Sequence, residues 1–381
     1  MKIENILVLF GADSKLEWGR SFQLAKAFHA NGHNVMYVDL PDPIRNTIKP
    51  KKTKDNLSDN GLFHIYKPKY GLPYGRIRIL KSLNREIIFR QVISRLLQLN
   101  FSPTLLWVYS PYEPEIARKI KDHFSIDKVI YDCADDRVAL ARLESGDRGA
   151  RMVEQLEREL CAFCTCIVSI TENLRKAKKG LNRNIIVIPN GIDTYMFSID
   201  RTMDMPDYYR KLPGRIILYA GTVVEWIDQE LMIESAKSNP NDSFVFVGPI
   251  RTDVTQMKGE PNIYFLGNKD YSDMPSYMAF ADLCVIPFKD NSYTRVSYTL
   301  KSLQYLAMGR HVLSTWYDGV NDYKGLVKVA ESREEFVNQI GTMLEHKENH
   351  DSKTLLEVLK AYSWKNLAAK ALKEVFTFKA I

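Results

Sequence analysis

The sequence predicts an α/β protein with two domains, each built on a doubly wound parallel sheet. Its 381 residues are long for one hydrophobic core and comfortable for two. Short runs of Val, Ile and Leu alternate with helical patterns along the whole chain, as they do in such sheets. The alternation pauses at 189–193 (PNGID), where Pro ends a strand and Gly permits a sharp turn. We therefore expect the domain boundary there.

The first domain opens with a β-α-β unit. Strands are expected at 5–10 and 34–39, and a helix at 20–31, which Gly32 ends. The loop after the first strand lacks Gly-x-Gly-x-x-Gly, so the chain does not carry the dinucleotide-binding fingerprint. The other elements expected here are strands at 62–66, 104–109, 128–132, 166–170 and 184–189, and helices near 81–99 and 150–162.

The second domain repeats the pattern and contains the stretch that organises the chain, residues 286–314. A strand closed by Pro287 leads through a polar loop into a helix at 299–308. The free N–H groups and dipole of that helix predict a phosphate site, and Lys301 and Gln304 share one of its faces. The elements expected in this domain are strands at 215–220, 243–247, 262–266, 283–288 and 311–314, and helices at 228–237, 273–280 and 299–308.

Residues 286–314 (IPFKDNSYTRVSYTLKSLQYLAMGRHVLS) resemble the donor-binding segment of GT-B glycosyltransferases. The resemblance is to bacterial exopolysaccharide and teichuronic-acid type enzymes related to glycosyltransferase group 1. The usual segment reads Pro-Leu-Lys-x-x-Glu-Tyr-Leu-Ala-x-Gly, and this chain has Thr299 and Gln304 at the Pro and Glu positions. Some inverting glucuronosyltransferases of this fold carry Met-Lys-x-x-Gln-Tyr here, which this chain resembles. The string at 189–193 is similar to the motif at the family's domain crossing.

The resemblance implies the GT-B architecture, with two Rossmann-like domains and a deep cleft between them. Residues 1–192 would form the acceptor-binding domain and residues 193–363 the nucleotide-sugar-binding domain. A last helix within 364–381 is expected to cross back to the first domain.

The resemblance also implies where the donor binds. Lys301 is expected to contact the pyrophosphate. Gln304 is expected to contact the ribose, because an amide keeps a carbonyl acceptor for a hydroxyl. A glycine after a strand is often only a turn, but several follow strands at one rim of this sheet. The implied donor residues are Gly221, Thr222 and Val223 at the diphosphate, Gly248, Gly267, Asn268 and Lys269 near the nucleobase, and Phe288, Thr299 and Leu300 in the organising stretch.

Three aspartates follow a buried strand, in the string DCADDR. Ligands of doubly wound sheets bind beyond the carboxyl ends of strands, so these carboxylates are expected to face the cleft. Resemblance to the inverting glucuronosyltransferases makes Asp135 the catalytic base, with Asp136 as the second candidate. Alternatively, Asp132 and Asp136 cap helices or form ion pairs. Arg137 and Arg142 would then be their partners.

Two residues of the first loop, Trp18 and Arg20, are candidates for contact with the acceptor or a phosphate. Their string, Trp-Gly-Arg-Ser, resembles the family's loop that faces the cleft. An arginine on the surface of a helix is the alternative for Arg20.

No metal and no cofactor other than the donor are expected. The chain lacks the Asp-x-Asp motif of the other glycosyltransferase fold. The string Cys161-x-x-Cys164-x-Cys166 has no second Cys/His cluster to complete a ligand set, so small buried hydrophobic residues are the better interpretation. The number of cysteines, five, is odd, no apolar run is long enough to span a bilayer, and the N-terminus reads as a strand. These features predict a cytoplasmic protein.

Positive charge is concentrated in residues 41–100. There, 13 lysines and arginines face 4 acidic residues, whereas the whole chain has a net charge of +7. Such a segment suits an anionic membrane surface, and a solvated face without a partner is the alternative. Nucleic acid is not expected, because no nucleic-acid motif accompanies the charge.

The resemblance, together with these features, implies an inverting glycosyltransferase. It would transfer a sugar from a nucleotide sugar to a lipid-linked or polysaccharide acceptor at the inner face of the cell membrane. UDP sugars are favoured, among them UDP-glucuronate and UDP-glucose. The alternatives are a retaining enzyme of the same fold, or an inactive partner protein that binds nucleotide sugars.

Overall fold

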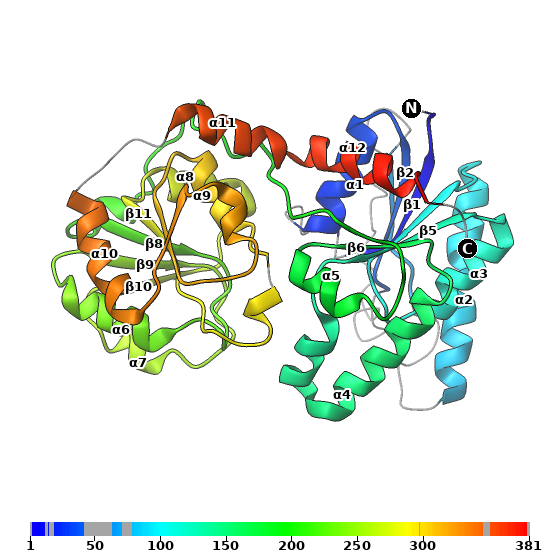
Figure 1. Cartoon of the computed structure of the whole chain (residues 1–381), viewed down its shortest axis with the longest axis horizontal. Helices are drawn as coiled ribbons and strands as arrows, with labels where there is room; N and C mark the ends of the chain where they lie inside the picture. Colours follow the sequence, from blue (N-terminus) through cyan, green and yellow to red (C-terminus); the bar gives the residue numbers. More distant parts are fainter. Residues whose placement is uncertain are drawn as a thin grey trace. The chain divides into compact units, whose positions relative to one another are not determined.

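The structure is a computed structural model, and it describes residues 2–11, 14, 19–41, 63–70, 78–296, 298–345 and 351–378. The chain divides into two compact units (Figure 1). Unit 1 comprises Met1–Pro189 with Trp364–Ile381, and unit 2 comprises Asn190–Ser363. Each unit is an α/β structure around its own parallel sheet, as the sequence predicts.

Unit 1 contains, in its described residues, a seven-stranded parallel sheet of order β3-β2-β1-β4-β5-β6-β7. Its strands are β1 (Asn5–Gly11), β2 (Asn34–Asp39), β3 (Phe63–Tyr66), β4 (Leu105–Val108), β5 (Lys128–Cys133), β6 (Cys166–Ser169) and β7 (Ile185–Val187). Its helices are α1 (Arg20–Ala30), α2 (Arg78–Gln98), α3 (Pro114–Phe124), α4 (Arg137–Cys161), α5 (Glu172–Lys178) and α12 (Trp364–Val375). Helices α1 and α12 cover one face of the sheet, and α2, α3 and α4 cover the other (Figure 1). Burial on both faces explains why these strands are nearly continuous apolar runs.

Helix α4 is longer than the sequence predicts. The expected helix near 150–162 in fact begins at Arg137, where the side chain of Asp136 caps it. Gly146 has φ 67° and ψ −168°, so it interrupts the helix between two regular parts. The interruption conceals the first part from a search for helical periodicity.

Unit 2 contains a six-stranded parallel sheet of order β10-β9-β8-β11-β12-β13 in its described residues. Its strands are β8 (Ile216–Ala220), β9 (Ser243–Val247), β10 (Ile263–Gly267), β11 (Leu283–Ile286), β12 (Val312–Ser314) and β13 (Val327–Val329). Its helices are α6 (Gln229–Ser238), α7 (Thr255–Lys258), α8 (Met274–Ala279), α9 (Lys301–Ala307), α10 (Arg333–Glu345) and α11 (Ser352–Ala361). Helices α6, α7 and α10 lie on one face of the sheet, with α8 and α9 on the other (Figure 1). Strand β13, which has only three residues, is not among the strands expected from the sequence.

The order of the strands reverses once in each sheet. The reversal lies between β1 and β4 in unit 1, and between β8 and β11 in unit 2. In open α/β sheets, ligands bind outside the carboxyl ends of the strands at such a switch point. The topology therefore points to one edge of each sheet.

The two segments that delimit unit 2 lie side by side. The amide of Ile192 donates to the carbonyl of Tyr362 at 2.9 Å, and Ile192 forms a parallel bridge with Ser363. These contacts assign Ile192 to unit 2, so the units divide after Pro189. The boundary expected from the sequence lies three residues later, after Ile192.

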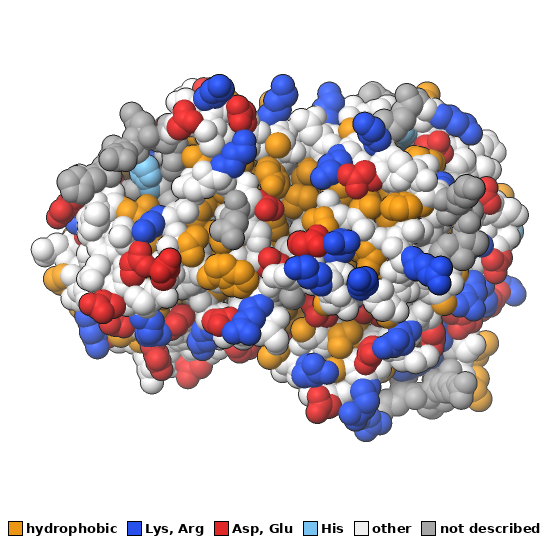
Figure 2. All heavy atoms as spheres, viewed as in Figure 1, with side chains coloured by type: hydrophobic (Ala, Val, Ile, Leu, Met, Phe, Trp, Pro, Cys, Tyr) orange, Lys and Arg blue, Asp and Glu red, His pale blue; other side chains and the backbone are white. Residues whose placement is uncertain are grey.

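The surface carries charges of both signs. On the face shown in Figure 2, lysine and arginine side chains lie among aspartate and glutamate side chains. Residues 42–62 and 71–77, which hold many of the basic residues of the 41–100 segment, lie outside the described part of the chain. Among the described helices, none is long and apolar enough to cross a membrane.

The three clustered cysteines are buried and lie within the core of unit 1. Burial raises the pKa of Cys161 and of Cys166 to about 12, so both are protonated thiols at neutral pH. In the described residues, no group of three His, Cys, Asp or Glu side chains could hold a metal ion.

Candidate functional site

The loops that follow β8 and β11 are bonded to each other at the switch point of unit 2. Ile227 forms an antiparallel bridge with Phe288. The amide of Asp228 donates to Pro287 O, and that of Lys289 donates to Trp226 O, each at 2.8 Å. The two loops therefore form one hydrogen-bonded backbone unit at the carboxyl edge of the sheet.

Two glycines at this edge allow close contacts that a side chain at either position would block. Gly221 has φ 151°, and a Cβ there would lie 2.3 Å from Cε of Lys301. Gly248 has φ 144°, and its Cβ would lie 2.3 Å from the carbonyl oxygen of Gly221. Both positions therefore require glycine, for close packing as well as for backbone conformation.

Lys301 is the first residue of α9, and that helix is fastened to the end of β8. The hydroxyl of Tyr305 accepts from the amide of Ala220 at 2.8 Å. The Lys301 ammonium lies over the rings of Tyr219 and Phe288, at 5.4 Å and 5.8 Å from their centroids. The side chain thus reaches the switch point directly beneath the Gly221 turn.

The electrostatics of Lys301 favour an anionic ligand. Desolvation by the surrounding protein lowers the pKa of Lys301 to about 8, from its ordinary 10.5. No carboxylate among the described residues forms an ion pair with its ammonium. The residue keeps partial contact with solvent, so a ligand can reach it. A desolvated cation without a protein counter-ion is stabilised when a phosphate binds to it.

The start of α9 differs from the prediction. The helix has seven residues and begins at Lys301 rather than Thr299. The hydroxyl of Thr299 accepts from the amide of Lys301 at 3.3 Å, while Leu300 occupies the N-cap position without a side-chain hydrogen bond. Because the Thr299 hydroxyl occupies one free amide and α9 is short, the helix dipole contributes less to anion binding than the sequence predicts. The Lys301 side chain is the stronger anion-binding group.

Gln304 lies one turn beyond Lys301 and is partly exposed. Its Nε2 donates to the hydroxyl of Tyr271 at 3.3 Å. Tyr271 lies in a short 3-10 helix, Tyr271–Asp273, between β10 and α8. The predicted pair Lys301 and Gln304 therefore does lie on one helix beside the switch point.

The other predicted donor residues are at the carboxyl ends of neighbouring strands. Val223 is buried, and its amide donates to Pro249 O at 2.8 Å. The carbonyl of Thr222 accepts from the hydroxyl of Tyr219 at 3.0 Å. Past β10, Asn268 is exposed and Lys269 partly exposed. Gly267 has φ 67° and open space around its Cβ position, which is typical of a simple turn.

In unit 1, Asp132 is fully buried within β5 and serves the structure. Its carboxylate accepts from Nε of Arg20 and from Nε1 of Trp107, both at 3.0 Å. The sequence offers Arg137 as a partner of Asp132, but the structure pairs Asp132 with Arg20 instead.

Arg20 is 7% exposed, also donates to Pro189 O at 2.8 Å, and lies 5.9 Å from the ring of Trp364. It is therefore not a surface arginine, and the predicted contact with acceptor or phosphate stays a prediction. Trp18 lies outside the described residues.

The two candidate bases have different environments. Asp136 caps α4 by accepting from the amides of Val138 and Ala139, and it pairs with Lys178 at 3.1 Å. Its carboxylate is therefore engaged in structure. Asp135 is 35% exposed at its side chain, beyond the carboxyl end of β5, with Arg137 at 3.5 Å. Asp135 is the better placed of the two to meet a substrate.

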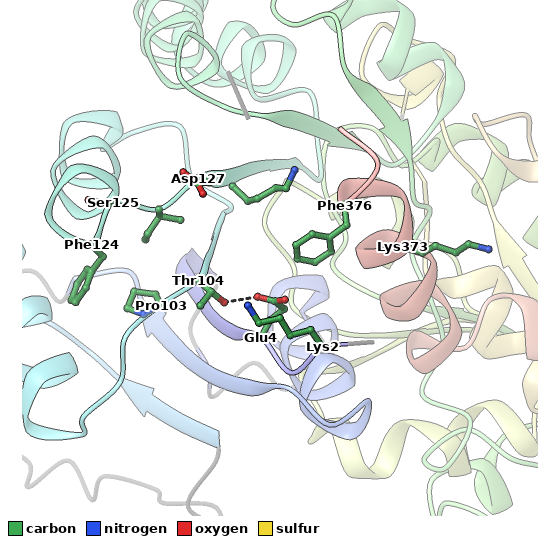
Figure 3. Close-up of a pocket in the computed structure, with 11 residues that line it drawn as sticks. Lys2, Glu4, Pro103, Thr104, Phe124, Ser125, Asp127, Lys373 and Phe376 are labelled. Atoms are coloured by element: carbon green, nitrogen blue, oxygen red, sulfur yellow. Dashed lines mark hydrogen bonds between the residues drawn. The ribbon is translucent and has the colours of Figure 1, made fainter. Parts of the chain in front are cut away.

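A cavity of about 700 Å³ lies at the opposite edge of the unit 1 sheet. Figure 3 shows side chains from the amino ends of β1, β4 and β5 and from α12 around it, with the hydroxyl of Thr104 donating to Glu4 at 2.6 Å. Ligands of doubly wound sheets bind at the carboxyl edge. This cavity is therefore not part of the candidate site.

Comparison with known proteins gives one family match and one curated relative. Residues 214–346 match the family "Glycosyl transferases group 1". TuaH of Bacillus subtilis (strain 168), which carries the name of a teichuronic acid biosynthesis glycosyltransferase, is 24% identical over 247 residues. That match covers 60% of this chain and 61% of TuaH.

Solved structures share the fold over nearly the whole chain. Anabaena Alr3699/HepE, in complex with UDP and glucose, has 14% identity and a TM-score of 0.69, covering 98% of this chain and 100% of that one. Sucrose-phosphate synthase (tll1590) from Thermosynechococcus elongatus has 14% identity and a TM-score of 0.69, covering 98% and 99%.

The chain therefore has the GT-B fold of these structures, and its residues 214–346 are similar to group 1 glycosyltransferases.

The group 1 match contains the switch-point site, from Gly221 to Gln304, and none of unit 1. The sequence does not predict the aromatic side chains that hold α9, Lys301 and Gln304 in place. These are Tyr219, Tyr271 and Tyr305. Tyr305 stands within the recognised motif and could have been found there, whereas Tyr219 and Tyr271 carry no local signal.

Proposed function

We propose that this glycosyltransferase binds a nucleotide sugar at the carboxyl edge of unit 2 and transfers the sugar to a hydroxyl of its acceptor. One observation carries the proposal: the Lys301 ammonium lies under the glycine turn at the switch point, and no carboxylate in the described part of the chain pairs with it. A diphosphate supplies the missing negative charge there. Gln304, one turn further along α9, is proposed to contact the ribose.

The donor is proposed to be a UDP sugar, with UDP-glucose and UDP-glucuronate as the first candidates. Support comes from two proteins of similar fold: HepE in complex with UDP and glucose, and an E. coli structure bound with UDP-2-fluoro glucose. A thermal-shift screen of UDP, GDP and ADP sugars tests the donor class. Stabilisation by UDP sugars alone is the expected outcome.

The proposed reaction is a single displacement that inverts the anomeric centre. The acceptor oxygen bonds to the anomeric carbon, the bond from that carbon to the diphosphate oxygen breaks, and the acceptor proton passes to Asp135. Lys301 stabilises the charge that develops on the departing diphosphate. Analysis of the product anomer by NMR tests this directly, because a retaining enzyme with Gln304 in place of glutamate gives the other anomer. Donor binding without any turnover would instead indicate an inactive binding protein.

Transfer is expected to need no divalent metal. Lys301 provides a cation at the diphosphate, and the chain lacks an Asp-x-Asp motif. We therefore expect turnover in excess EDTA to remain within about twofold of the untreated rate. Loss of turnover in EDTA, restored by Mg²⁺ or Mn²⁺, would contradict a role for Lys301 as the main counter-charge.

The acceptor is proposed to be a lipid-linked or growing polysaccharide at the cytoplasmic face of the membrane. The name of TuaH, a teichuronic acid biosynthesis glycosyltransferase, supports a role in the synthesis of a polysaccharide. The basic segment 41–100 supports binding to an anionic surface. In the first two turns of α2, Ile79 and Leu83 are exposed beside Lys81, a combination that suits a membrane interface.

Binding to vesicles is expected to depend on anionic lipid and on salt. Contacts between lysines and lipid phosphates are screened beyond about 10 Å at 0.1 M salt, so sedimentation with anionic vesicles should fall as salt rises. Neutral vesicles are the control. Equal binding to both kinds of vesicle would contradict the electrostatic contact.

A further inference from the structure

The hydrogen bond between Tyr271 and Gln304 joins two elements that flank the proposed donor site. Tyr271 reaches from the segment after β10, and Gln304 projects from α9. The ring of Tyr271 packs edge-on against buried Phe197, at 5.6 Å between centroids. Both members of the pair are partly exposed, so a ligand can contact them.

The two ends of a glutamine amide are chemically different. Its NH₂ group only donates, and its carbonyl oxygen only accepts. Because the Gln304 NH₂ group donates to the Tyr271 hydroxyl, the carbonyl oxygen is held at the other end of the amide. A carboxylate has no such distinction, since both of its oxygens accept. The orientation of residue 304 therefore matters only when that residue is glutamine.

We propose that Tyr271 is a positioning residue that fixes the Gln304 amide, so that its carbonyl oxygen accepts a hydrogen bond from a ribose hydroxyl of the donor. This proposal rests on the proposed function, because it assigns Gln304 to the nucleotide. Tyr271 and Gln304 together would recognise nucleotides that keep the ribose hydroxyl. Without the phenol, the amide can rotate and the acceptor is no longer fixed.

The test is a double-mutant cycle of Tyr271→Phe and Gln304→Glu, with UDP as the probe in calorimetry and GDP and ADP in parallel. A net hydrogen bond is worth about 0.5–1.5 kcal/mol, so Tyr271→Phe should weaken UDP binding about 3- to 10-fold when residue 304 is glutamine. In the Gln304→Glu protein, Tyr271→Phe should weaken UDP binding by less than about twofold. Phenylalanine keeps the ring packing on Phe197, so folding should be preserved, and thermal unfolding checks this.

Deoxynucleotides provide a second readout. The probes are 2′-deoxy-UDP and 3′-deoxy-UDP, each of which lacks one ribose hydroxyl. The loss of affinity from UDP to the deoxynucleotide should be larger in the wild type than in the Tyr271→Phe variant. Tyr277→Phe is the matched control: Tyr277 lies in nearby α8, packs on Tyr209 at 5.5 Å, and should leave UDP affinity unchanged.

Equal losses in both backgrounds of the cycle would show that Tyr271 acts through packing, and would overturn the proposal. No loss in either background would overturn it as well. Both results leave the proposed function standing, provided that UDP binds and that binding depends on Lys301. If UDP, GDP and ADP all fail to bind the wild type, both the inference and the proposed donor site are wrong.

Discussion

Lys301→Met is expected to make the free protein more stable and to weaken UDP binding about 10- to 100-fold. The binding loss follows because a charge-assisted contact to the diphosphate is worth about 1.5–3 kcal/mol. The gain in stability follows because methionine fills similar space between Tyr219 and Phe288 without a desolvated charge. A gain of about 1 kcal/mol raises the Tm by about 2–4 °C. Calorimetry with UDP and thermal unfolding measure the two effects.

The pH dependence of both effects follows from the lowered pKa of Lys301. In the folded protein the pKa of Lys301 is about 8, below its ordinary 10.5, so folding disfavours the charged form. The resulting destabilisation is fully present below about pH 8 and disappears as the pH rises towards 10.5. The stability advantage of methionine should therefore be largest at or below pH 8.

UDP affinity should show the same ionisation. Above pH 8 the free wild type loses the Lys301 proton, so its affinity for UDP should fall by up to about tenfold per pH unit, while the methionine variant stays level. Lys258→Met, at an exposed lysine of α7, is the matched control and should change neither property. If Lys301→Met kept wild-type affinity for UDP, Lys301 would not be the diphosphate contact.

The sequence allowed the sheets and the Lys301–Gln304 pair to be predicted because both depend on local patterns. Buried parallel strands appear as apolar runs, and two side chains one turn apart share a helix face whatever surrounds them. The recognised segment around residues 286–314 placed that helix at the end of a strand. The structure confirms the two parallel sheets and places the helix beside the switch point.

The rest of the site depends on contacts between segments far apart in the chain. Asp132 illustrates this: the sequence offers Arg137 as a neighbour, but the buried partner is Arg20, from the start of α1. Likewise, the rings around the Lys301 ammonium come from β8 and from the segment after β11. Strand order sets these pairings, and the local pattern of a sequence does not encode it.

Asp135→Asn is expected to lower turnover by about 10² to 10⁴, the usual contribution of a general base. Asparagine keeps the size of the side chain but cannot take the proton from the acceptor hydroxyl. UDP affinity should stay unchanged, because the proposed donor contacts lie in unit 2 and Asp135 lies in unit 1. Stability should also change little, because the side chain is 35% exposed and its ion pair with Arg137 is long, at 3.5 Å. Single-turnover kinetics, calorimetry and thermal unfolding measure the three quantities.

Asp136→Asn supplies the contrast, because the neighbouring carboxylate has a structural role. Asparagine can still cap α4, but it removes the charge that faces buried Lys178, so stability should fall by about 1–3 kcal/mol. Glu157 still pairs with Lys178 at 2.8 Å, which limits that loss. Turnover per folded molecule should be retained.

If both variants lose turnover alike, the two aspartates act as a unit, and the assignment of the base to Asp135 alone is wrong. If a stably folded Asp135→Asn enzyme turns over at the wild-type rate, no base is needed at this position, and a retaining mechanism becomes the better account of the reaction.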